Sequence, residues 1–372
     1  YVAAIVTANT FSTIIAGRTR RIALLRLIGA TAGEVRGMMI LESLRQALVG
    51  LVLGSVLYVA TCPAWSLLTF QEKRVGTWEM FTWWVIPAAW IVVLVLAASS
   101  VWLALRRVAV TPLGVTKKLP PEGQSAITLV LSVVGAVVLY RYLSSINIAL
   151  GVDAAAFAGM LVVAGGNLTV NALIAVGVIQ LLARLSYRVP GAANYVATRR
   201  VGRGAKTTWK RVAALYFVAF IGGICGFFSA VPEIDEAPAL KMIAGDIPSG
   251  VAITVVFAAV LLVSSTLLTQ ALSVVEQKQL TKSFYFIGAP AAFHTKVAAR
   301  EVGVPMLVVA LLGFGMGSLT GTVMVVVHVD VMDKLALFGG FVVVALIGCV
   351  LAVLGTGRLR EKVLLGMGRA KD

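Results

Sequence analysis

The sequence predicts an all-α polytopic membrane protein, and three observations support that fold class. Apolar residues make up 59% of the 372 residues and charged residues only 13%, whereas water-soluble domains carry about 25% charged residues. The apolar residues fall into runs of about 20, which is the length that a helix needs to cross a bilayer. One segment of the first half of the chain returns in the second half at a fixed offset, which indicates an internal duplication.

We expect nine transmembrane helices, which span Tyr1–Gly17, Gly37–Thr61, Trp83–Leu105, Ser125–Leu143, Ala154–Leu182, Val212–Val231, Gly250–Leu272, Val302–Val327 and Leu335–Leu354. The duplication pairs Tyr1–Gly17 with Gly250–Leu272 and leaves Val212–Val231 without a counterpart, so a further span is expected upstream of Tyr1. The full protein would then contain two four-span units joined by two central spans. The first unit, as seen here, lacks its first span.

The predicted domains follow this duplication. Residues 1–118 form the first repeat unit, residues 119–185 form a linker with the two central spans, and residues 186–372 form the second repeat unit. The clearest linker is Lys117–Gln124, which contains two prolines and a glycine and has no apolar period.

The basic residues that give the net charge of +16 are concentrated in alternate loops. Of the 32 lysines and arginines, 26 lie in alternate loops, namely Arg18–Arg36, Arg106–Lys118, Arg184–Arg211, Lys278–Arg300 and Arg358–Lys371. This positive-inside pattern predicts that these loops and the C-terminus are cytoplasmic. We expect Arg184–Arg211 to face anionic lipid head groups, which attract each basic residue by roughly 1 kcal/mol. Nucleic acid is not an expected partner, because no aromatic residues interleave with the charge in a recognition module.

The loops between the other span ends are predicted to lie outside. Cys62–Thr82 carries tryptophans within it or at its borders, which is typical of an interfacial belt, although a ligand platform is the alternative. A second outer loop begins at Pro232, contains the acidic run Glu233–Glu236 and is expected to end near Pro248.

A basic elbow precedes the second span. Its arginines lie on a short helix-forming run that Gly29 is expected to end, since glycine is the usual residue just past a helix. Thr31 then opens the next helix with Glu34 three residues on, which is the spacing of a capping box. The element recurs 259 residues later, where Gly288 matches Gly29 and Pro290 stands in place of Thr31; proline also suits the first turn of a helix.

The run from Leu25 to Thr31, LRLIGAT, resembles the elbow of FtsX/MacB-type permeases of ABC transporters, in which a span with an early glutamate and a late glycine follows. Here these residues are Glu42 and Gly54. The resemblance implies that each elbow is a coupling helix that seats in a separate ATPase subunit. The first coupling site would comprise Leu25, Arg26, Ile28, Gly29, Ala30, Thr31 and Glu34. The second would comprise Phe284, Tyr285, Ile287, Gly288, Ala289 and Pro290, with Tyr285 in place of the arginine.

The resemblance also implies an assembly in the bacterial plasma membrane. Because two units share one chain, we expect one permease chain with two ATPase chains, which would hold the ATP and Mg²⁺. The chain itself is expected to be no enzyme and to bind no cofactor, since its sequence contains no Walker motif; Gly204–Thr208, which superficially resembles a phosphate loop, lacks the glycine before the lysine. Two functions remain open: export or extraction of an amphiphile, or mechanical activation of an extracellular cell-wall hydrolase or a sensor kinase.

Polar residues and glycines within the spans are further candidates. Glu42 and Arg45 lie three residues apart on one helical face, and Glu301 occupies the matching position in the second copy; such residues are either structural pairs or functional. Asn167 and Asn171 are expected to bond across helices or to line a substrate path. Close helix packing is predicted at Gly50, Gly54, Gly313, Gly317 and Gly321. His294 and His328 fall on opposite sides of the membrane, so no metal site is expected.

Overall fold

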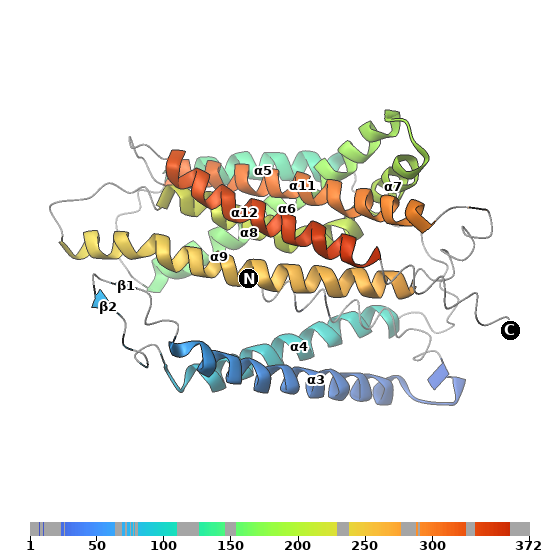
Figure 1. The fold of residues 1–372 in the computed structure, drawn as a ribbon, viewed down its shortest axis with the longest axis horizontal. Helices are drawn as coiled ribbons and strands as arrows, with labels where there is room; N and C mark the ends of the chain where they lie inside the picture. The colour runs from blue at the N-terminus through green and yellow to red at the C-terminus, as the bar shows by residue number, and fades with distance from the viewer. Residues whose placement is uncertain are drawn as a thin grey trace. The chain divides into compact units, whose positions relative to one another are not determined.

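The computed structural model describes residues 7, 10, 24–25, 27–63, 69–70, 73–74, 76, 78, 81–109, 126–145, 154–228, 238–276, 288, 291–324 and 332–357. The helices among them are α3 (Ala32–Thr61), α4 (Val85–Ala109), α5 (Ala126–Ser145), α6 (Ala154–Leu185), η2 (Ser186–Arg188), α7 (Ala192–Arg203), α8 (Ala205–Phe228), α9 (Pro238–Glu276), α11 (Ala291–Met324) and α12 (Met332–Gly355) (Figure 1). The predicted helical fold is confirmed. The described residues depart from it only in an antiparallel pair of two-residue strands, β1 (Thr69–Phe70) and β2 (Lys73–Arg74).

Seven of the described helices are long and apolar enough to cross a membrane, namely α3, α4, α6, α8, α9, α11 and α12. The predicted count of nine spans stays a prediction. Tyr1–Gly17 lies outside the described residues except for positions 7 and 10. In α5, which covers the expected span Ser125–Leu143, the apolar stretch that qualifies is the shorter Ile127–Val138.

Several helices begin earlier than the sequence predicted. α9 begins at Pro238, so the expectation of a loop to near Pro248 was wrong, and α11 begins at Ala291. Adding a residue to an existing helix gains a hydrogen bond without a new nucleus, so polar residues beside an apolar span can join it. Arg184–Arg211 is likewise not a loop throughout, because it contains η2 and α7.

The described part of the chain divides into two compact units, of which the first contains α3, α4 and the strand pair. The Trp90 indole N–H donates to the Ser55 hydroxyl at 2.9 Å and joins the two helices. Near the start of α3, Val35, Met39 and Val101 form a small buried cluster. Much of the remaining surface of α3 is apolar and exposed, as expected of a helix that faces lipid.

The second unit contains α5 to α12 apart from the first residues of α9. Helix α8 lies at its core, and residues 212–220 of α8 are all buried. α8 packs most extensively against α11 and also contacts α12 and α6, while α5 packs on α6 and α11. Figure 1 shows α7 at the end of this bundle where α11 begins and α12 ends.

A polar contact inside the second unit ties α5 to α11. The Tyr140 hydroxyl lies 2.8 Å from the Thr320 hydroxyl and donates to the Met316 carbonyl at 3.3 Å. On α6, the Asn171 amide donates to the Asn167 side chain at 2.6 Å, so these two amides bond to each other within one helix.

Candidate functional site

The first elbow ends a helical segment at a glycine in the left-handed region. Gly29 has φ 101°, and the Ala30 N–H donates to the Leu25 carbonyl at 3.0 Å. This bond reaches back five residues across a left-handed glycine, which is the defining bond of the Schellman motif. The predicted helix end at Gly29 is therefore confirmed.

The next helix begins with two reciprocal hydrogen bonds. The Thr31 N–H donates to Glu34 Oε2 at 2.8 Å, and the Glu34 N–H donates to Thr31 Oγ1 at 3.3 Å. The predicted capping box at the start of α3 is confirmed. Because local bonds fix the helix end before Gly29 and the helix start after it, the turn between them has little freedom to bend.

The elbow presents apolar side chains at its tip. Leu27 and Ile28 are 82% and 84% exposed, whereas Leu25 and Ala30 pack against the cluster of Val35, Met39 and Val101. The packed residues fix the elbow to α3 and α4, and the exposed pair is not covered by any of the described residues. Gly29, Thr31 and Glu34 are exposed as well, and Arg26 lies outside the described residues.

The second elbow repeats the backbone geometry that is described for the first. Gly288 has φ 88°, and α11 begins three residues later at Ala291, just as α3 begins at Ala32, three residues after Gly29. The other predicted residues of this elbow, Phe284, Tyr285, Ile287, Ala289 and Pro290, lie outside the described residues.

Glu301, on α11, is the centre of an ion-pair bridge between three helices. Its Oε2 lies 3.2 Å from Nη1 of Arg200 on α7, and its Oε1 lies 3.2 Å from Nη1 of Arg211 on α8. The Glu301 side chain is 13% exposed, and the two arginines are 29% and 24% exposed. Each carboxylate oxygen thus has its own cationic donor in partly desolvated surroundings, where ion pairs are stronger than in water.

Sequence reasoning identified Glu301 but not its two partners. The sequence contains only a general indication of the partners. An acidic residue at the end of a span needs a positively charged partner, and Arg184–Arg211 is the most basic segment of the chain. In the first copy, Glu42 is partly buried and Arg45 is exposed on the same helix.

Just beyond the bridge, α11 contains Pro305. Proline has no N–H, so the Glu301 carbonyl, four residues earlier, lacks its usual helical donor. This leaves a weak point in the helix directly after the bridge.

Beyond Pro305, two glycines bring α11 against the backbone of α8. A Cβ atom on Gly313 would lie 2.5 Å from the Tyr216 carbonyl oxygen, and one on Gly317 would overlap the Phe220 carbonyl. Gly321 is buried on the same helix. In the first unit, a Cβ atom added to Gly50 or Gly54 would have no atom of the described structure within 4 Å.

Among the hollows that the described residues line are a small pocket and an open groove in the second unit. A pocket of about 50 Å³ between α6, α7 and α11 has room for little more than water. An open groove of about 490 Å³ lies between α5, α6 and α11, with Val133, Val137 and Leu319 among its apolar lining and Tyr140 and Arg141 as its polar residues. The described residues include no group of three or more histidine, cysteine or acidic side chains that could hold a metal ion.

The first elbow, α3 and α4 lie in a segment that a known protein family shares. Residues 1–113 match the family model of the FtsX-like permease C-terminal domain. The seven apolar helices of the described residues indicate a multi-pass membrane protein, and the match likens its first 113 residues to FtsX-like permeases. Comparison with curated proteins and with solved structures found no match.

The FtsX-like segment includes all of the first predicted coupling site, as well as Glu42, Arg45, Gly50 and Gly54. The second elbow and the Glu301 bridge lie beyond the matched residues. Their relation to the FtsX-like segment depends on the sequence offset and on the shared geometry at Gly29 and Gly288.

Proposed function

We propose that this chain is the permease subunit of an ABC transporter in the bacterial plasma membrane. It couples ATP hydrolysis, with Mg²⁺, on two separate ATPase subunits to the export or extraction of an amphiphilic substrate such as a peptide antibiotic, a lipid or a lipoprotein. The observation that carries this proposal is the first elbow, which is capped on both sides, lies within the FtsX-like match and exposes Leu27 and Ile28.

The mechanical basis is the continuity of the elbow with α3. A rigid turn transmits a displacement of its tip to the helix it precedes, and α3 continues for 30 residues without a break. Closure of two ATPase subunits on ATP would therefore tilt the attached spans. The left-handed glycine before α11 supports a second coupling site in the same chain, and with it two FtsX-like units and two ATPase subunits per chain.

The groove between α5, α6 and α11 supports an amphiphilic substrate. Its volume of about 490 Å³ lies in the range of small-molecule sites, about 300–1,000 Å³. Its surface is almost wholly apolar, with Val133, Val137 and Leu319 among the lining residues, which suits the apolar chain of such a substrate.

The coupling role of the elbow predicts a specific effect of Gly29→Ala. Alanine at φ 101° costs about 1–2 kcal/mol in the left-handed region, so the turn should relax to another conformation and move Leu27 and Ile28. We expect affinity for the ATPase subunit, measured by titration on the permease in nanodiscs, to fall about tenfold, which corresponds to about 1.4 kcal/mol.

Gly33→Ala is the matched control for this prediction. It makes the same substitution four residues away in the first turn of α3, where the nearest atom would lie 4.0 Å from the new Cβ, and alanine favours a helix by about 1 kcal/mol over glycine. ATPase affinity should be unchanged in this variant. Equal affinities for the two variants would remove the elbow from the coupling mechanism.

Transport and mechanical transmission can be separated in proteoliposomes that contain the permease, its ATPase and no other protein. A head-group-labelled phospholipid and a labelled peptide antibiotic serve as probes. ATP-dependent movement of either probe supports transport. ATP hydrolysis without movement of a probe, together with activation of a cell-wall hydrolase or sensor kinase added from outside, supports transmission instead.

A further inference from the structure

We propose that the exposed face of η2 and α7 binds the head groups of anionic phospholipids. This face is called here the α7 surface and consists of Tyr187, Tyr195, Arg199 and Arg203. The proposal goes beyond ATPase coupling and does not depend on it, because it concerns the bilayer around the chain.

The position of α7 places this surface at the end of two membrane-spanning helices. η2 and α7 connect the end of α6 to the start of α8. Toward the protein, α7 buries Ala197, Thr198 and Val201, and it packs against α6 and α11. Away from the protein, Tyr195, Arg199 and Arg203 are exposed at intervals of four residues, so they form one face of the helix.

Arg199 is held between two aromatic rings on this face. Its guanidinium carbon lies 5.3 Å from the centroid of the Tyr187 ring and 5.1 Å from that of the Tyr195 ring. Both distances are within the range of cation–π contacts. The rings restrict the side chain while the residue stays exposed, so the guanidinium is already positioned to bind a phosphate with two hydrogen bonds.

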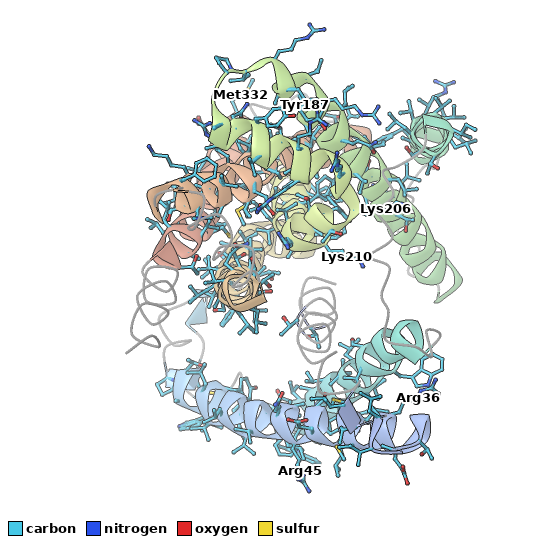
Figure 2. The ribbon with its side chains drawn as sticks, turned by 90° about the vertical axis from the view of Figure 1, so that its right-hand side faces the viewer. Arg36, Arg45, Tyr187, Lys206, Lys210 and Met332 are labelled. Atoms are coloured by element: carbon cyan, nitrogen blue, oxygen red, sulfur yellow. The ribbon has the colours of Figure 1, made fainter. Side chains whose placement is uncertain are left out.

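The segment that contains the α7 surface carries positive charge and has no acidic residue of its own to neutralise it. Residues 184–211 contain eight lysines and arginines and no acidic residue. Glu301, which does approach this segment, is engaged by Arg200 and Arg211 rather than by the exposed arginines of the α7 surface. Figure 2 looks onto this end of the second unit and shows Tyr187, Lys206 and Lys210 there; both lysines are exposed.

Apolar neighbours favour a lipid over an acidic protein as the ligand. Leu181 and Leu185, near the end of α6, are each 52% exposed and lead along the chain to Tyr187. Exposed leucines on a span suit acyl chains, tyrosine rings suit the interface between chain and head group, and arginines suit the phosphate. The order of these residues along the chain therefore matches the order of the parts of one phospholipid.

The test is native mass spectrometry of the full chain in detergent with equimolar phosphatidylglycerol and phosphatidylcholine that carry the same acyl chains. We expect bound phosphatidylglycerol to exceed bound phosphatidylcholine. The double variant R199Q/R203Q should lower this preference about tenfold or more, because each basic residue near an anionic surface contributes about fivefold. The double variant K296Q/R45Q is the matched control, since it removes two exposed positive charges that belong to α11 and α3 rather than to η2 or α7, and it should keep the preference.

Several results would overturn the proposal. One is an unchanged preference in R199Q/R203Q, and another is an equal loss in the control variant. A third is loss of ATPase binding in R199Q/R203Q with lipid preference intact, which would make the surface a protein interface. Should that variant fail to purify as a monodisperse protein, Tyr195→Ala keeps every charge and removes one ring beside Arg199. It must still lower the preference, and an unchanged preference there would also refute the proposal.

Discussion

Glu301→Gln is expected to remove the ion pairs that join α11 to α7 and to α8. Glutamine keeps the size of the side chain but removes the charge, which leaves Arg200 and Arg211 close together without their shared carboxylate. Removing one partner of a buried ion pair costs about 3–5 kcal/mol. Because the arginines are 29% and 24% exposed, water offsets part of this cost, and we expect a loss of about 2 kcal/mol. The measurement is thermal unfolding of the purified chain in detergent.

Two further variants isolate the cause. Lys296→Gln removes an exposed charge from the same helix and should leave the unfolding temperature unchanged. Replacing all three partners with apolar side chains, as E301L/R200M/R211M, removes the bridge without leaving an unpaired charge, so it should be more stable than Glu301→Gln alone. A Glu301→Gln protein that unfolds at the wild-type temperature would show that the bridge does not hold the three helices together.

Gly317→Leu is expected to separate α8 from α11. Even the first side-chain atom would overlap the Phe220 carbonyl of α8, and backbone cannot give way as a flexible side chain can. Overpacking of a tight contact costs about 1–3 kcal/mol, and a contact between two backbones should reach the upper end of that range. We expect a marked fall in folded yield and in unfolding temperature in detergent.

Gly315→Leu is the control for the packing prediction. Gly315 lies two residues away on the same helix, is exposed, and has no atom of the described structure within 4 Å of its Cβ position. The two variants change helix propensity and apolarity equally, so a difference in stability between them reports the contact with α8. Similar losses in both variants would contradict the packing described here.

The elbow could be predicted from the sequence because its interactions are local. Gly29 ends one helical segment, and Thr31 with Glu34 begins the next, through hydrogen bonds that span three to five residues. Local signals of this kind are determined by a few neighbouring residue types. The apolar spans were predictable for a similar reason, since the bilayer fixes the length of each run.

The partners of Glu301 could not be predicted in this way. Arg200 and Arg211 are separated from it by 101 and 90 residues, and no local pattern specifies which arginine of a basic segment reaches which acid. Helix α7 was missed because its mean composition is polar, while the part that decides its placement is the small buried face of Ala197, Thr198 and Val201. Both features depend on tertiary packing, which overrides local propensity.

Pro305 lies between two attachments of α11 to α8, the Glu301 bridge and the contact at Gly313 and Gly317. On one side of the proline, Glu301 attaches α11 to α8 through Arg211; on the other side, Gly313 and Gly317 attach α11 to the backbone of the same helix. With both attachments in place, bending at the proline is opposed on either side. If the bridge opens, the first three or so turns of α11 can pivot while the remainder stays fixed to α8. The displacement of a single carboxylate would then decide whether α11 moves as one body or as two.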